Sequence, residues 1–122
     1  MQAELDTFPV PDHLILVESR SEGPSTCFAG DCPRATRYYV SERTVDETCN
    51  DMMNAVSDWG ADAEWHHNIE RNNCGMSTHH GRDELAVSVF PASRLRPDVA
   101  TNLDPADADR YPTAVIVGLS VP

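Results

Sequence analysis

The chain contains no lysine, so all nine of its basic residues are arginine, and they stand against twenty aspartates and glutamates. The formal net charge at pH 7 is therefore -11. An electrostatic field of this sign repels phosphate backbones and anionic lipid headgroups. We therefore expect neither nucleic acid nor a membrane surface as a partner.

Long apolar segments are also missing. No segment approaches the roughly 20 apolar residues that a helix needs to cross a bilayer, and residues 1–12 lack the basic and apolar regions of a signal peptide. This predicts a soluble chain with no direct membrane insertion by this segment. Met1 followed by Gln-Ala-Glu also fits a start that remains once a signal peptide or anchor has been removed, and we favour that interpretation.

Catalytic motifs are missing as well. The chain has no G-x-S-x-G elbow, no H-E-x-x-H, no G-x-x-x-x-G-K phosphate loop and no dinucleotide fingerprint. Asp104, Asp107 and Asp109 offer oxygen ligands for calcium, but the central glycine and terminal glutamate of an EF-hand loop are absent. We therefore predict a protein that is not an enzyme and that uses no cofactor.

What the chain does contain is typical of one globular domain. It has 122 residues, of which 40% are hydrophobic and 24% are charged, enough for a single modest core. Residues 1–12 carry two prolines and no periodicity, which predicts a flexible leader. The folded domain is expected over residues 13–122.

The clearest secondary-structure signal covers residues 44–59. Thr44-Val-Asp-Glu47 is a capping box, and Gly60 can provide a left-handed C-terminal stop. Between them apolar residues recur at three- and four-residue spacing, which predicts a helix with one buried face. That face comprises Val45, Cys49, Met52, Met53, Val56 and Trp59.

Apolar runs and alternating patterns predict about five strands. They fall near residues 14–19, 34–40, 65–70, 85–89 and 114–121. Residues 72–83 are expected to form a long polar loop, and residues 91–112 an irregular segment with one short helix beginning at Asp104-Pro105. This order predicts a two-layer α+β domain, with one long helix packed across a mostly antiparallel sheet.

Four cysteines in a small domain indicate a disulfide framework in an exported protein. Structural zinc sites usually use closely spaced cysteine pairs, whereas the gaps here hold four, sixteen and twenty-four residues. Cys49 lies on the apolar helix face and Cys74 just past the third predicted strand. We therefore predict bonds between Cys49 and Cys74 and between Cys27 and Cys32.

Histidines provide the main alternative. His66-His67 and His79-His80 flank Cys74 and Met76, so six possible soft or borderline ligands lie within fifteen residues. Adjacent strand residues point to opposite faces, and the disulfide consumes Cys74. A zinc or copper site would therefore use His67, His79 and His80, but we predict no tightly bound ion.

Aromatic residues are few, and four are predicted at leader, loop or solvent-facing positions: Phe8, Phe28, Tyr39 and Tyr111. They either anchor a partner or fold back onto the core.

The leading functional hypothesis is a non-enzymatic extracytoplasmic domain, secreted or tethered to the cell envelope, that binds a protein or an envelope component. One alternative is the zinc- or copper-binding protein with His67, His79 and His80. The other is an acidic inhibitor or immunity-type protein that covers a basic target by charge complementarity.

Overall fold

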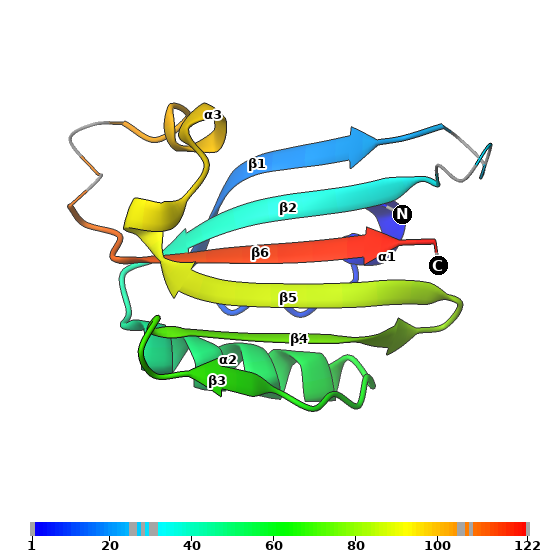
Figure 1. Ribbon diagram of the computed structural model, residues 1–122, viewed down its shortest axis with the longest axis horizontal. Helices are drawn as coiled ribbons and strands as arrows, with labels where there is room; N and C mark the ends of the chain where they lie inside the picture. The colour runs from blue at the N-terminus through cyan, green and yellow to red at the C-terminus, as the bar shows by residue number, and fades with distance from the viewer. Residues whose placement is uncertain are drawn as a thin grey trace.

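The computed structural model describes residues 2–24, 27, 29, 32–104, 107 and 109–121. Its centre is a six-stranded antiparallel sheet with the strand order β1-β2-β6-β5-β4-β3 (Figure 1). The elements are α1 Gln2–Leu5, β1 Leu14–Glu22, β2 Arg34–Ser41, α2 Val45–Asp58, β3 His66–Asn68, β4 Asn73–His80, β5 Asp83–Pro91, η1 Ala92–Arg94, α3 Pro97–Ala100 and β6 Thr113–Ser120. The predicted α+β class is confirmed, with one strand more than expected.

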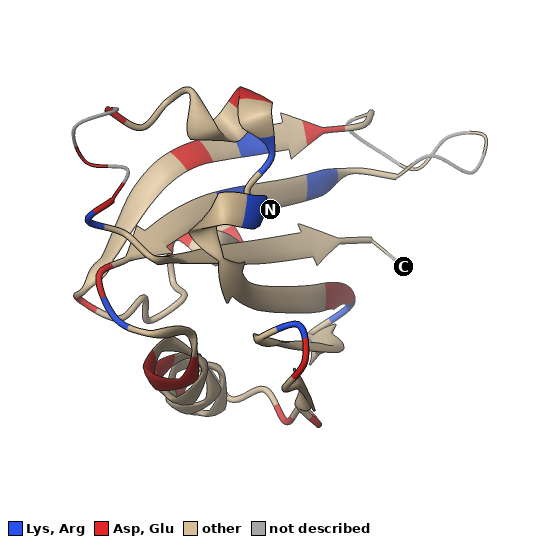
Figure 2. Cartoon of the chain, turned by 60° about the vertical axis from the view of Figure 1, so that its left-hand side comes forward, with Lys and Arg blue, Asp and Glu red and all other residues tan. Residues whose placement is uncertain are grey.

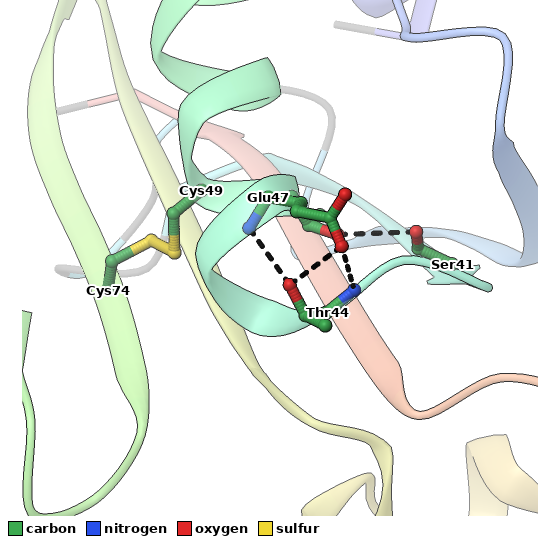
Figure 3. The surroundings of a disulfide bond; sticks show 6 residues. Ser41, Thr44, Glu47, Cys49 and Cys74 are labelled. Carbon is green, nitrogen blue, oxygen red and sulfur yellow. Dashed lines mark hydrogen bonds between the residues drawn. A yellow bond between two sulfur atoms is a disulfide. The ribbon is translucent and has the colours of Figure 1, made fainter.

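Both ends of α2 form as the sequence predicts. At the start, the Thr44 hydroxyl accepts from the Glu47 amide at 3.2 Å, and the Glu47 carboxylate accepts from the Thr44 amide at 3.4 Å (Figure 3). At the end, Gly60 adopts a φ of 84°, and the Ala61 amide donates to the Val56 carbonyl at 3.2 Å. The amides and carbonyls that a helix end leaves unpaired are thus satisfied at both termini.

The predicted face of α2 packs on the sheet, mainly against β4 and β5. Val45, Cys49, Met52 and Val56 are buried there. Met53 and Trp59 are only half-buried, because they lie at the margin of the stripe.

Residues 2–12 are not the flexible leader that we expected. Leu5 is 1% exposed and Phe8 is 5% exposed, and both belong to the core between sheet and helix. The Gln2 side chain donates to the Arg20 carbonyl of β1 at 3.0 Å and accepts from Arg37 of β2 at 3.0 Å. The leader prediction was wrong because a helix of one turn is too short to show periodicity in the sequence. Leu5 and Phe8 pack on the part of the sheet beside α2.

Residues 72–83 are a strand and a tight turn rather than a loop. β4 pairs with β5 from Cys74 to His80, and Gly81, with a φ of 63°, lies in the turn between them. Cys74 and Met76 point into the core, while Ser77 and His79 are exposed on the opposite face. The segment looked like a loop because one face of this strand has no cover, so its side chains there are polar.

The third strand is shorter than expected and ends at Asn68. A turn follows, in which the Arg71 amide donates to the Asn68 side chain at 3.1 Å and Asn72 has a φ of 51°. Ile69 therefore leaves the sheet and is 93% exposed, instead of sharing a face with Trp65 and His67.

The second face of the sheet is covered only in part. Leu95 and Val99, from the segment with η1 and α3, pack on Tyr38, Val40 and Ala114. A helix of one turn in this segment begins at Pro97, where proline is favoured at the first helical position. The short helix expected to begin at Asp104-Pro105 falls on residues that the structure describes only in part. Pro105 lies outside the described residues.

The structure contains both predicted disulfides, Cys27–Cys32 and Cys49–Cys74. The second joins α2 to β4, and its Cα atoms are 6.3 Å apart (Figure 3). A closed loop of this length stabilises a fold by about 3 kcal/mol in the chain-entropy model. Because Cys49 and Cys74 are both buried, this bond is also shielded from reductants.

Candidate functional site

The uncovered part of the second sheet face contains a groove of about 1000 Å³. Its lining comes from β3, β4, β5, β6, residues 69–71 of the turn after β3, and η1. The groove exists because the segment with η1 and α3 covers only the neighbouring end of this face.

Small residues form the floor of the groove. Gly75 of β4 and Ser88 of β5 are direct partners in the sheet, and Ser77 lies two residues further along β4. A Cβ atom added at Gly75 would lie only 3.2 Å from the Val87 carbonyl oxygen. Because glycine has no side chain and that of serine is short, a ligand on this floor can approach the strand backbone closely.

The walls combine apolar and charged groups. Phe90 and Ile116 are half-buried and contribute apolar surface. At the rim, Ile69 is exposed, and Arg94 of η1 donates a hydrogen bond to the Arg71 carbonyl of the turn. This bond joins the two walls of the groove.

The three histidines of the alternative metal-site hypothesis do not converge. His67 lies opposite Cys74 at one end of β4, whereas His79 and His80 lie at the other end. At about 3.3 Å per strand residue, roughly 17 to 20 Å separate them. His79 and His80 also point to opposite faces. Among the described residues, no three histidine, cysteine, aspartate or glutamate side chains are grouped as metal ligands.

A Ser–His–Asp arrangement occurs elsewhere, and no sequence motif marks it. His13 lies between Ser41 and Asp51, with its Nδ1 2.9 Å from the serine Oγ and its Nε2 2.7 Å from the aspartate Oδ2. Ser41 is 0% exposed, and its Oγ also accepts from the Arg43 amide at 3.0 Å. A nucleophile must reach its substrate, so this cluster is a structural link between β2, α2 and the residues before β1.

A second polar cluster surrounds His80. Its Nδ1 lies 3.0 Å from Glu4 Oε1, and its ring stacks on Trp59 with the centroids 3.5 Å apart. The hydrogen bond to Glu4 and burial raise the pKa of Asp83. Burial alone would raise the pKa of Glu4, but the hydrogen bonds with Asp83 and His80 outweigh it, and that pKa is lowered. The two carboxyl groups thus share a proton-dependent contact that fastens α1.

Three of the four aromatic candidates pack against the domain. Phe8 and Tyr39 are buried in the main core, and Tyr111 is half-buried against the apolar cluster that contains Leu95 and Val99. Phe28 lies outside the described residues.

A second hollow, of about 790 Å³, has Ala100, Leu103 and Tyr111 in its lining. Its lining, as far as the described residues show it, is mostly apolar and includes no histidine or arginine.

No helix in the described ranges is long and apolar enough to span a bilayer. Comparison of the chain with protein-family models, with curated proteins and with solved structures finds no match.

Proposed function

We propose that this domain is a non-enzymatic extracytoplasmic binding module, secreted or tethered to the cell envelope. It holds a protein or an envelope component in the groove over β3, β4 and β5. The observation that carries the proposal is the groove itself, which combines small floor residues, apolar walls and hydrogen-bonding groups, the usual composition of a ligand site.

The two disulfides support a location outside the reducing cytosol. Such bonds persist in secreted, periplasmic and cell-surface proteins and are rare in the cytosol. The domain carries two in 122 residues, and no cysteine is free.

The position of the polar clusters supports binding rather than catalysis. The groove is lined neither by Ser41, His13 and Asp51 nor by Glu4, His80 and Asp83. Its serines, Ser77 and Ser88, have no histidine hydrogen-bonded to them in the described chain, and Ser77 donates to Glu84 at 2.9 Å. An activated serine requires an adjacent base.

Site-specific crosslinking tests this proposal. A photoreactive phenylalanine is introduced at position 69 on the exposed rim of the groove and, as a matched control, at position 57 on the exposed side of α2. Both proteins are irradiated with an envelope fraction and with secreted proteins. We expect a discrete adduct at position 69 only, suppressed by excess unlabelled wild type but not by excess Ser88→Trp, whose indole fills the floor. Equal labelling at both positions, or equal competition by both proteins, would refute groove binding.

The net charge of -11 favours a second candidate, an acidic inhibitor or immunity-type protein. Acidic residues are spread over several elements and loops (Figure 2). Charge complementarity of this kind mainly accelerates association, and salt screens it. A partner of this class would be basic, and its association rate would fall at least tenfold between about 20 and 300 mM salt. A partner captured at the groove with a salt-independent rate would exclude this candidate.

A further inference from the structure

Most arginines of this chain are neutralised by acidic partners. Six of the nine form ion pairs: Arg20, Arg34, Arg37, Arg43, Arg96 and Arg110. In the described part of the chain, Arg71, Arg82 and Arg94 have no carboxylate within ion-pair distance. With more than twice as many acids as arginines in the sequence, an unpaired guanidinium is unexpected.

Two of these three arginines line the groove. Arg71 belongs to the turn after β3, and Arg94 to η1, on the facing wall. Glu70 is the one acidic residue in the described lining. The charge balance of the groove is therefore the reverse of that of the whole molecule.

Arg94 is held in place without being neutralised. One of its NH groups donates to the Arg71 carbonyl, which leaves its other N–H donors for a ligand. The planar guanidinium matches a carboxylate through two parallel hydrogen bonds. Its fixed orientation reduces the conformational entropy that binding would remove.

Apolar surface lies in the same groove. Phe90 and Ile116 are half-buried there, and Ile69 is exposed at the rim. The volume of about 1000 Å³ is at the upper end of the range for small-molecule sites. The open shape and the small floor residues suit an extended chain of a few residues, lying close to the β4 and β5 backbone.

We propose that the groove binds an extended acidic peptide segment of a partner protein. An aspartate, glutamate or C-terminal carboxylate of that segment pairs with Arg94 and Arg71, and a neighbouring apolar side chain packs on Phe90 and Ile116. This inference rests on the proposed function, because it names the ligand class of the same groove.

Peptide selection tests the ligand class directly, because it does not require a purified partner. A random-sequence displayed peptide library is selected on the immobilised wild-type domain, after depletion on Ser88→Trp to remove peptides that bind elsewhere. We expect selected sequences enriched in aspartate or glutamate beside an apolar residue. Arg94→Gln and Arg71→Gln should each weaken binding by about tenfold or more, the loss of one charge-assisted hydrogen bond.

Arg82→Gln is the matched control. Arg82 also lacks an acidic partner, but it lies in the β4–β5 turn outside the groove, so its substitution removes the same charge and should leave binding unchanged within twofold. Melting temperatures of all three variants establish that each is folded. Replacing the peptide's acidic residue with its amide should match the loss caused by Arg94→Gln.

Four results would overturn the proposal. If the selected peptides were not enriched in acidic residues, the groove would still be a binding site, but it would not recognise acidic groups. Equal losses from Arg82→Gln and Arg94→Gln would show a general charge effect. Failure to recover any peptide that distinguishes wild type from Ser88→Trp would refute peptide binding, and crosslinking at position 69 would then decide whether the groove binds a different ligand. Inorganic phosphate that competes at micromolar concentration would also identify a phosphate site in place of a carboxylate site.

Discussion

The indole of Trp59 stacks on the imidazole of His80, with an angle of 4° between the two ring planes. Trp59 is the C-cap of α2 and His80 is the last residue of β4, so the contact joins helix and sheet at the end opposite the Cys49–Cys74 bond. Phe8 packs edge-on against the same indole, with the ring centroids 5.1 Å apart, and the indole NH donates to Thr7. Thr7 and Phe8 therefore hold the segment before β1 against the end of α2.

Because His80 is occupied in this contact, we predict that added zinc or copper does not stabilise the domain. A site that used His67, His79 and His80 would add about 2.7 kcal/mol at a hundredfold excess of the ion over its dissociation constant. Native mass spectrometry and melting with each ion measure this. One retained equivalent with a marked thermal shift, both lost in the double variant His79→Ala and His80→Ala, would contradict the prediction.

The disulfides give a second prediction. Peptide mapping of protein matured in an oxidising compartment should recover Cys27 linked to Cys32 and Cys49 linked to Cys74. Replacing Cys49 and Cys74 with alanine should lower the free energy of unfolding by about 3 kcal/mol, measured in urea. Four free thiols in such protein would remove the argument for an extracytoplasmic location.

The buried face of α2 is tested by a pair of acidic substitutions. Met52 is fully buried and Asn54 is exposed on the same helix. Met52→Asp should lower the free energy of unfolding by about 3 to 5 kcal/mol, because it removes core packing and buries a charge. Asn54→Asp should change it by less than about 0.5 kcal/mol. Equal melting temperatures would mean that the helix presents a different face to the sheet.

The Ser41 network should contribute to stability. Ser41→Ala leaves His13 and the Arg43 amide without their buried partner. We expect a loss of about 1 to 3 kcal/mol in the free energy of unfolding. Ser57→Ala, on the exposed side of α2, is the control and should have little effect. Identical unfolding curves for the two variants would show that the network adds nothing.

The Glu4–Asp83 contact predicts a pH dependence of stability. Contact with Glu4 raises the pKa of Asp83, so the stability contributed by its protonated form is complete below the ordinary value of 3.8 and is lost as the pH rises through the raised value. Glu4 acts in the opposite direction, because its pKa is lowered from 4.5: its contribution is present above that value and is lost as the pH falls through the lowered value.

Asp83→Asn separates these two contributions, because the amide still donates to Glu4 but does not ionise. The melting temperature of this variant should rise relative to wild type as the pH increases from about 4 to 7. Asp12→Asn, at an exposed position before β1, is the control and should show no such trend. A constant difference between Asp83→Asn and wild type across this range would show that the two carboxyl groups are not coupled.

The amino-acid sequence by itself determined the local features of this protein. Thr44 and Glu47 specify where α2 begins, the spacing of Cys49, Met52 and Val56 specifies its buried face, and Gly60 specifies its end. Caps, turns and helical periodicity act between residues a few positions apart, so they can be recognised from the sequence. The pairing of Cys49 with Cys74 followed from the same helix face.

Only the tertiary structure decided which surfaces are covered. It placed Leu5 and Phe8 in the core, turned a polar stretch into β4, and brought Ser41, His13 and Asp51 together. It also left Arg71 and Arg94 without an ion pair to any described residue, on facing walls of the groove and joined by one hydrogen bond. These features depend on the strand order and on how much of each sheet face the helices cover. The free energy of such long-range packing has no local signature in the sequence.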